Sequence, residues 1–216
     1  MTVTPERILA AAADRGLHLD PAAAERMADY LALLIKWNKA MNLVGPSKPE
    51  VVFDTLFVDS LYLGMFLETL PLPAEPVCLD LGSGAGLPGI PLRCFWERGE
   101  YHLIELREKR ASFLRTALGR LRPARTVAHR GRAEEVATTL PPADCIVSRA
   151  FMPWRELTGF VRSMLAPDGL LVVLANDPAP RPDELPEGWA LGGETSYPAA
   201  GKTRFFWSLS TARPTS

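Results

Sequence analysis

The stretch that decides the fold of this chain reads Val77-Cys78-Leu79-Asp80-Leu81-Gly82-Ser83-Gly84-Ala85-Gly86-Leu87-Pro88-Gly89-Ile90-Pro91. It begins as a short apolar run, which is typical of a buried strand, and continues with glycines at alternate positions. Because glycine adopts backbone conformations that other residues avoid, the pattern predicts a tight turn from a strand into a helix. Backbone N–H groups at such a turn are open to a small ligand.

The spacing of the acid and the glycines narrows the class of ligand. The pattern Asp-x-Gly-x-Gly-x-Gly differs from the Gly-x-Gly-x-x-Gly of dinucleotide-binding folds, and no Lys-Ser or Lys-Thr follows, which excludes a P-loop. It resembles the first motif of the Rossmann-like methyltransferases, which bind S-adenosylmethionine. The alternative is a turn that binds no ligand. Under the first interpretation, the cofactor-binding residues here are Asp80, Gly82, Ser83, Gly84 and Gly86.

The composition is that of a globular protein. The chain has 216 residues, of which 47% are hydrophobic, enough for one domain with an appendage. No apolar run reaches the length of a membrane span, and the N-terminus lacks the pattern of a signal peptide. Cys78, Cys94 and Cys145 form no CxxC pair, and the three histidines are scattered. We therefore expect reduced core cysteines, no metal site and a cytoplasmic location.

The charge is unevenly distributed. Residues 93–132 contain eleven basic and four acidic residues, a net charge of +7, whereas residues 1–72 carry a net charge of −3. A positive segment in a nearly neutral protein favours an anionic partner such as nucleic acid. A solvated helix face is the alternative explanation. The candidate RNA-binding residues are Lys109, Arg110, Arg115, Arg122 and Arg132.

The first part of the chain predicts a small helical unit. Thr4-Pro5 and Asp20-Pro21 each place a capping residue before a proline, which is a typical helix start. A third helix is expected over about residues 49–69, and a proline-rich linker follows it. We therefore divide the chain into an N-terminal helical unit, residues 1–72, and a cofactor-binding domain, residues 73–216.

Beyond the linker, short apolar strands alternate with helical segments. This alternation indicates an α/β fold of the Rossmann-like class I methyltransferase type, with a mostly parallel, doubly wound sheet. Two further strand candidates within residues 188–210 predict an antiparallel C-terminal hairpin, which suits a methyltransferase better than a dehydrogenase. The expected strands are 77–81, 101–106, 126–129, 144–148 and 170–174, and the expected helices are 87–97, 108–121, 133–139 and 153–165.

The ends of the predicted strands carry further candidates, because parallel sheets bind ligands beyond the carboxyl ends of their strands. Glu105 ends the second strand about twenty residues after the glycine turn, where an acid accepts hydrogen bonds from ribose hydroxyls. The alternative is an ion pair with Lys109 or Arg110. Ala133 and Glu134 follow the third strand, where an adenine would lie; alternatively, they form an ordinary acid-rich helix N-terminus.

Arg149 follows the fourth strand, the point nearest to the transferred methyl group in this topology. Its guanidinium would hold a substrate phosphate or the carboxylate of the cofactor, and Phe151 or Trp154 would stack on a base. The alternative is a structural ion pair between Arg149 and Asp59 or Asp80.

Several segments, in order along the chain, carry a more specific pattern. Through them the chain resembles the RsmG (also called GidB) family of bacterial ribosomal RNA methyltransferases. The resemblance implies S-adenosylmethionine-dependent methylation of a guanine, at ring nitrogen seven, in small-subunit (16S) ribosomal RNA, either free or in an assembling 30S particle. It also implies cofactor contacts at Gly82, Leu87, Ala133, Glu134 and Arg149. The matching segments are Trp37-Asn38, Asn42-Leu43, Asp59-Ser60, residues 80–91, Lys109-Arg110, Phe113-Leu114, Arg132-Ala133-Glu134 and Ser148-Arg149-Ala150.

The reaction that the resemblance implies needs no general base. Ring nitrogen seven of guanine has a free lone pair and no proton to lose, so direct displacement depends mainly on positioning. The candidate catalytic residues that position the reactants are Asn42, Asp59 and Arg149. Alternatively, Asn42 caps a helix or turn and Asp59 locks the helical unit onto the sheet. We expect a monomer that binds neither metal nor membrane.

The chain departs from the family pattern at two places. Thr55-Leu56 stands where the family usually has Arg-His, and Ala175-Asn176 stands where it usually has Lys-Gly. These losses predict weaker RNA binding rather than loss of the reaction. Two alternatives stay open: a methyltransferase of the same fold that acts on another RNA site, and a cofactor-binding, RNA-associated protein with reduced catalysis. The glycine spacing argues against an NAD-dependent oxidoreductase.

Overall fold

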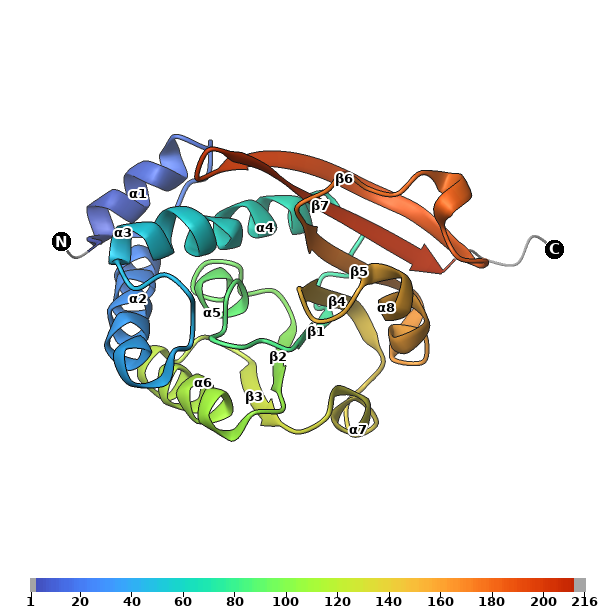
Figure 1. Ribbon diagram of the computed structural model, residues 1–216, viewed down its shortest axis with the longest axis horizontal. Coiled ribbons are helices and arrows are strands. Elements are labelled where there is room, and N and C mark those ends of the chain that lie inside the picture. The colour runs from blue at the N-terminus through green and yellow to red at the C-terminus, as the bar shows by residue number, and fades with distance from the viewer. Residues whose placement is uncertain (1–2, 212–216) are drawn as a thin grey trace.

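In the computed structural model, which describes residues 3–211, the chain forms one seven-stranded sheet with helices on both faces (Figure 1). The strand order is β3-β2-β1-β4-β5-β7-β6, with β1 to β5 parallel and β7 antiparallel to both of its neighbours. The predicted class I methyltransferase architecture with a C-terminal hairpin is confirmed. The strands are β1 (Val77–Leu81), β2 (Glu100–Glu105), β3 (Thr126–Arg130), β4 (Ala143–Arg149), β5 (Leu165–Ala175), β6 (Trp189–Ala199) and β7 (Lys202–Thr211).

The strand order reverses between β1 and β4, and this reversal positions the site. From β1 the chain runs outward to β3 and then crosses back to β4 on the other side of β1. The crossing helices are α5 (Gly89–Leu92), α6 (Glu108–Leu121), α7 (Ala133–Ala137) and α8 (Trp154–Val161). Because the five strands are parallel, their carboxyl ends meet at one edge, and ligands of open α/β sheets bind at this switch point.

Both faces of the central strands are buried, which explains their continuous apolar sequences. Cys78 in β1 faces the core that the sheet shares with the N-terminal helices, and Leu79 faces the core that contains residues of α7 and α8. The first of these cores extends without interruption from Ile8 to Phe206. The N-terminal helices are therefore packed directly onto the sheet.

The N-terminal helices begin where the sequence predicts. The Thr4 side chain accepts a hydrogen bond from the Arg7 N–H, and the Asp20 carboxylate accepts one from the Ala22 N–H. The predicted third helix is also present, although one turn in its middle is π-helical. The elements are α1 (Pro5–Ala13), α2 (Pro21–Met41), α3 (Pro49–Val52), the π-helical turn Phe53–Phe57 and α4 (Val58–Thr69).

The helix predicted over residues 87–97 is wrong in length. Helix α5 covers only Gly89–Leu92, because Arg93 turns inward after it. The fully buried guanidinium donates to the carbonyls of Trp96, Arg98, Gly99 and Ala124. Because these carbonyls accept hydrogen bonds from Arg93, they need no helical partners. An irregular loop therefore takes the place of the helical turns predicted over residues 93–97. Smaller differences are that β5 begins earlier than predicted and that α8 ends earlier.

Candidate active site

A cavity of about 380 Å³ opens at the switch point of the sheet. Residues from several strand ends line it: Gly82 after β1, Glu105 at the end of β2, Ala133 at the start of α7 and Phe151 after β4. Leu106, whose side chain is 57% exposed, adds an apolar surface. We call this the donor cavity. It contains Gly82, Glu105, Ala133 and Glu134 of the residues predicted to bind the cofactor.

Backbone conformation explains the glycines of the turn. Gly82, Gly84 and Gly86 all have positive φ, at 66°, 58° and 83°, where side chains are strained. Glycine is required at position 82 for a second reason, because a Cβ built there would lie 2.6 Å from the Phe151 ring. The ring therefore lies directly over the start of the turn, at the wall of the donor cavity.

Glu105 joins the turn to the end of β2. Its side chain is buried, and its two carboxylate oxygens accept hydrogen bonds from the backbone N–H groups of Gly84 (3.0 Å) and Arg107 (2.8 Å). The alternative ion pair with Lys109 or Arg110 is absent from the described contacts. Each carboxylate oxygen has two lone pairs, so the group keeps acceptor capacity toward the cavity that it lines.

Asp80 lies beneath the turn and does not line the donor cavity. Its buried carboxyl accepts a hydrogen bond from the Tyr101 hydroxyl at 3.3 Å, and a Cβ built at Gly89 would lie 2.5 Å from its Oδ2. Burial raises the pKa of Asp80 to about 7, although hydrogen bonds from Tyr101 and Ser83 oppose the shift. Two other predicted cofactor residues, Ser83 and Leu87, are also buried in the turn.

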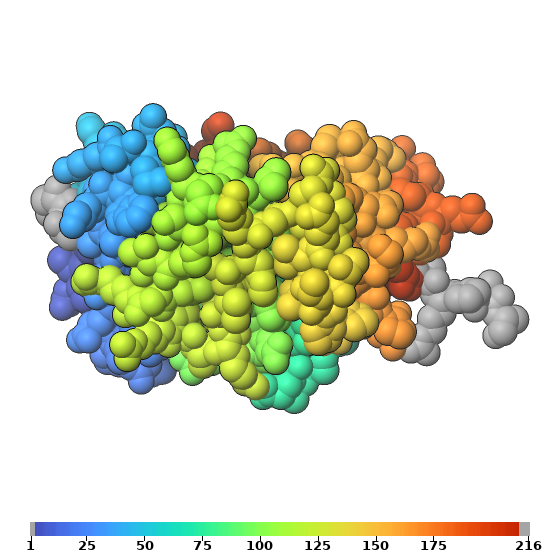
Figure 2. Space-filling model, turned by 90° about the horizontal axis from the view of Figure 1, so that it is seen from below, coloured from blue at the N-terminus to red at the C-terminus, as the bar shows by residue number. Residues whose placement is uncertain are grey.

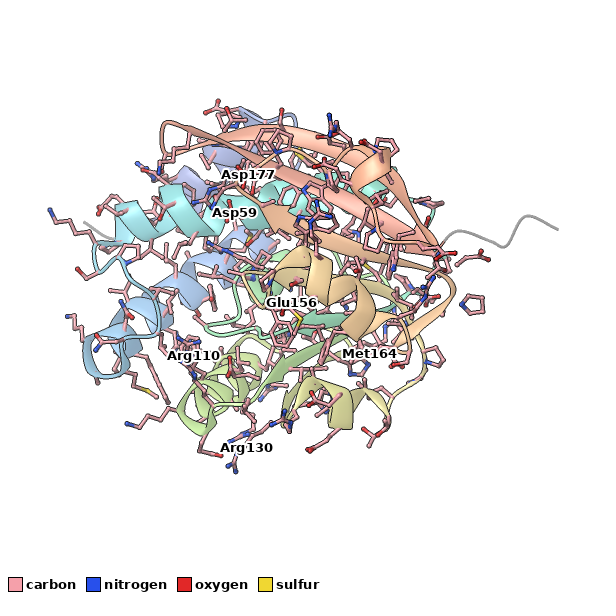
Figure 3. All side chains as sticks on the ribbon, turned by 45° about the vertical axis from the view of Figure 1, so that its right-hand side comes forward. Asp59, Arg110, Arg130, Glu156, Met164 and Asp177 are labelled. Atoms are coloured by element: carbon pink, nitrogen blue, oxygen red, sulfur yellow. The ribbon has the colours of Figure 1, made fainter. Side chains whose placement is uncertain are left out.

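A second cavity, of about 200 Å³, lies between β4, β5, α4 and the C-terminal hairpin, and we call it the acceptor cavity. Asp59 on α4, 1% exposed, is its central carboxylate (Figure 3). Asp59 Oδ2 lies 3.4 Å from Arg149 Nη1 and 2.6 Å from Arg204 Nη1, and its Oδ1 accepts a hydrogen bond from the Tyr197 hydroxyl at 2.9 Å. Ala175 also lines this cavity.

The electrostatics of the acceptor cavity favour an anion. Burial raises the pKa of Asp59, while Arg149, Arg204 and Tyr197 all stabilise its ionised form. Burial also raises the pKa of the Tyr197 phenol, which therefore stays protonated as a donor. When Asp59 is ionised, two guanidinium groups share one carboxylate, so the cluster retains a positive charge.

The two cavities meet at Ala150, which lines both of them. This residue follows Arg149 directly and has a φ of 52°, a left-handed conformation that residues other than glycine rarely adopt. Strained backbone of this kind is concentrated at functional sites. The turn at Ala150 lets Arg149 face the acceptor cavity while Phe151 lines the donor cavity.

The structure shows the contacts on which several of the sequence-based alternatives depend. Arg149 forms its ion pair with Asp59, and Asp59 ties α4 to β7 through Arg204. Asn42 is the exposed C-cap of α2, with a φ of 48°, and lines neither cavity. Tyr197 and Arg204 were missed, because no motif in the sequence marks either residue.

The basic segment is only partly free to bind a partner. Arg93 is buried, Arg115 pairs with Glu108 at 3.1 Å, and Arg132 pairs with Glu134 at 2.7 Å. Of the five cations predicted to bind RNA, those that form no ion pair among the described residues are Lys109, Arg110 and Arg122.

A cavity of about 620 Å³ lies beside the segment that leads into β2, and two of its charged groups, Arg26 and Glu97, pair with each other at 3.2 Å. Within residues 3–211, no group of three His, Cys, Asp or Glu side chains is arranged to hold a metal ion. Nor does any helix in this range have both the length and the apolar character needed to cross a bilayer.

Comparison with known proteins identifies the family. The model of the family described as rRNA small subunit methyltransferase G (GidB) matches residues 23–181. The chain belongs to this family. A relative from Nitratidesulfovibrio vulgaris, named ribosomal RNA small subunit methyltransferase G, is 54% identical over 91% of this chain and 89% of its own length. A relative of the same name from Lawsonia intracellularis is 42% identical over 91% of both chains.

Solved structures agree on the fold of the GidB-family chain. TrmN from Thermus thermophilus matches with a TM-score of 0.55 at 20% identity, over 70% of this chain and 48% of its own. The tRNA methyltransferase TrmK of Bacillus subtilis matches with a TM-score of 0.54 at 14% identity, over 74% of this chain and 68% of its own. At these identities the likeness establishes the class I methyltransferase fold alone.

Proposed function

We propose that this chain transfers a methyl group from S-adenosylmethionine to ring nitrogen seven of a guanine in small-subunit ribosomal RNA. The observation that carries the proposal is the meeting of the donor and acceptor cavities at Ala150, at the switch point of a methyltransferase fold. Membership of the rRNA small subunit methyltransferase G family supports the reaction and the kind of RNA.

The residues of the donor cavity suit this cofactor. The free lone pairs of Glu105 would accept hydrogen bonds from ribose hydroxyls, and Leu106 and Ala133 would offer apolar contact to the adenine. Gly82, which lines the cavity and has no side chain of its own, would let the amino-acid portion approach the backbone. When bound, the cofactor supplies an electrophilic methyl group.

The residues of the acceptor cavity would position the guanine. Because the attacking nitrogen carries a lone pair and no proton, the site needs no general base. Arg149 and Arg204 would bind a phosphate next to the target nucleotide, and Asp59 would hold both guanidinium groups in place. Arg204 lies in the same cavity as Ala175, so the chain has a cation there although it lacks the usual Lys of the family.

The proposal is tested by combining binding and transfer measurements. Isothermal titration calorimetry with S-adenosylmethionine should show one site, and tritiated methyl groups should enter small-subunit particles that lack the modification. Particles that already carry 7-methylguanosine at the target serve as the matched control and should accept none. Binding without transfer to free RNA or particles would contradict the proposed substrate, and absence of binding would contradict the cofactor.

A further inference from the structure

The lysines of this chain are concentrated at one end of two helices. Of the five lysines, Lys36 and Lys39 lie on α2, Lys48 directly precedes α3, and Lys109 lies in the first turn of α6. None of these side chains forms an ion pair or hydrogen bond among the described residues. Most arginines, in contrast, are held by acids or carbonyls, so these lysines, together with Arg110 and Arg122, are among the cations that are available to a partner.

The packing of α2 against α6 brings the C-terminal end of α2, which carries Lys36 and Lys39, next to the first turn of α6, which carries Lys109. Asp29 pairs with Arg120 at 3.1 Å, and the Trp37 ring meets the Phe113 ring at 5.5 Å. The two helices therefore run antiparallel, and the C-terminal end of α2 lies next to the first turn of α6. Figure 2 shows the corresponding light-blue and green surfaces side by side. Arg110, in that first turn, lines the donor cavity (Figure 3).

An apolar groove of about 230 Å³ lies along the same part of α2. Its walls are Leu31, Ala32 and Ile35 on α2, with Val3 before α1 and Pro49 at the start of α3. Lys36 and Lys39 line it as well, and both are exposed. The volume is below the range of roughly 300–1,000 Å³ typical of drug-sized ligands, so it suits a single planar ring system.

We propose that this groove, which we call the α2 groove, binds one unpaired nucleotide of the RNA substrate outside the target guanine. The base lies against the apolar wall, and Lys36 and Lys39 contact the phosphates on either side of it. Unpaired bases that stack on apolar or aromatic surfaces, with basic residues along the backbone, are the usual means of recognising single-stranded RNA. The inference rests on the proposed function, because it requires the RNA substrate.

Two groove variants, each with a matched control, separate the phosphate contacts from the base contact. The double variant Lys36→Gln/Lys39→Gln removes two cations, and Lys202→Gln/Arg181→Gln removes the same charge at exposed positions outside the groove. Ala32→Trp fills the groove without changing charge, and Ala10→Trp adds the same bulk on an exposed part of α1. Fluorescence anisotropy with a small-subunit RNA fragment, at several salt concentrations, reports affinity and salt slope.

The expected results are distinct for each variant. The lysine variant should bind RNA at least tenfold more weakly. The slope of log K against log salt concentration should also become shallower, by up to about 1.4 if two contacts to single-strand phosphates are lost. Ala32→Trp should weaken binding several-fold at an unchanged slope, and both controls should match the wild type. The affinity for S-adenosylmethionine should be the same in all variants.

Three outcomes would overturn the inference. Wild-type affinity and slope in both groove variants would show that RNA does not use the groove. If only the lysine variant had a lower RNA affinity, the lysines would contact phosphates but no base would bind in the groove. Unchanged RNA affinity with reduced methylation of particles would assign the groove to a ribosomal protein. A failure of the proposed function is distinguishable, because the wild type itself would then not transfer methyl groups.

Discussion

The Tyr30 hydroxyl, on the second helix, donates a hydrogen bond of 2.7 Å to the Ala85 carbonyl in the glycine turn. Tyr30 is fully buried, between the rings of Phe57 and Phe113. The N-terminal helices thus hold the turn that lines the donor cavity, and they contribute to the site without contacting a ligand directly.

Removing that hydroxyl should loosen the turn. Tyr30→Phe leaves the Ala85 carbonyl without this donor, so we expect a loss of about 1–3 kcal/mol in the free energy of unfolding. The affinity for S-adenosylmethionine should fall several-fold in calorimetry. Tyr62→Phe is the control, because Tyr62 makes a ring stack with Tyr197 but its hydroxyl forms no hydrogen bond with any residue from 3 to 211. Equal effects of the two substitutions would contradict a role for the hydrogen bond.

The cluster around Asp59 should be sensitive to loss of its charge. Asp59→Asn leaves Arg149 and Arg204 partly buried without a counter-charge, so we expect about 3 kcal/mol less stability in urea unfolding and at least tenfold slower methyl transfer. Asp54→Asn breaks an exposed pair with Arg7 and should change stability by less than about 1 kcal/mol. Wild-type transfer rates in Asp59→Asn would rule out a positioning role for this carboxylate.

Gly82 allows a test of steric conflict separately from backbone strain. Gly82→Ala combines a positive φ with a clash against Phe151, whereas Gly16→Ala has a similar φ of 74° and open space. Both should lose about 1–2 kcal/mol of stability through strain. Only Gly82→Ala should also lose cofactor affinity, by more than tenfold. Similar cofactor affinity in both variants would show that the Gly82 position does not shape the site.

Cofactor binding should depend on the two acceptor oxygens of Glu105, which an amide of nearly the same shape does not supply. Glu105→Gln replaces one acceptor oxygen by a donor NH₂, so one of the N–H groups of Gly84 and Arg107 loses its partner. We expect at least tenfold weaker binding of S-adenosylmethionine, with unchanged RNA affinity in anisotropy. Glu134→Gln, at a partly exposed position of the same cavity, should have a smaller effect. The reverse order would assign the cofactor contact to Glu134.

Asp80 should make stability depend on pH. Its folded-state pKa, about 7, lies above the unfolded value near 3.8, so the folded state binds the proton more tightly. The resulting penalty is absent below about pH 4, grows as pH rises to about 7, and stays constant above that value. Asp80→Asn should therefore be more stable relative to the wild type at pH 8 than at pH 4.5, by urea unfolding. A difference independent of pH would contradict the raised pKa.

Much of the fold was predictable because its signals are local. Short apolar runs predict β1 to β5, and the order of these strands predicts that Gly82, Glu105 and Ala133 lie close together, as they do in the donor cavity. The sequence left two candidate ion-pair partners for Arg149, namely Asp59 and Asp80. The observed pair with Asp59 depends on how α4 packs against the sheet, which the sequence does not show.

The features that were missed depend on contacts between distant segments. Tyr197 and Arg204 belong to a hairpin whose sequence carries no site motif, and they reach Asp59 across 138 and 145 residues of chain. Arg93 was counted with the surface charges because the net charge of a segment does not show which guanidinium is buried. The length of α5 was wrong for the same reason, since Arg93 donates to carbonyls of the loop that follows the helix.

The hairpin that carries Tyr197 and Arg204 is the last part of the described chain to be synthesised. A growing chain therefore holds α4 and β4 before β6 and β7 exist, and proteins generally begin to fold from the N-terminus during translation. At that stage the donor cavity has all of its residues, while the acceptor cavity has an open wall. Competence to receive the RNA is thus acquired only once β6 and β7 have been synthesised, so chains truncated before this hairpin should be inactive even where they still bind the cofactor.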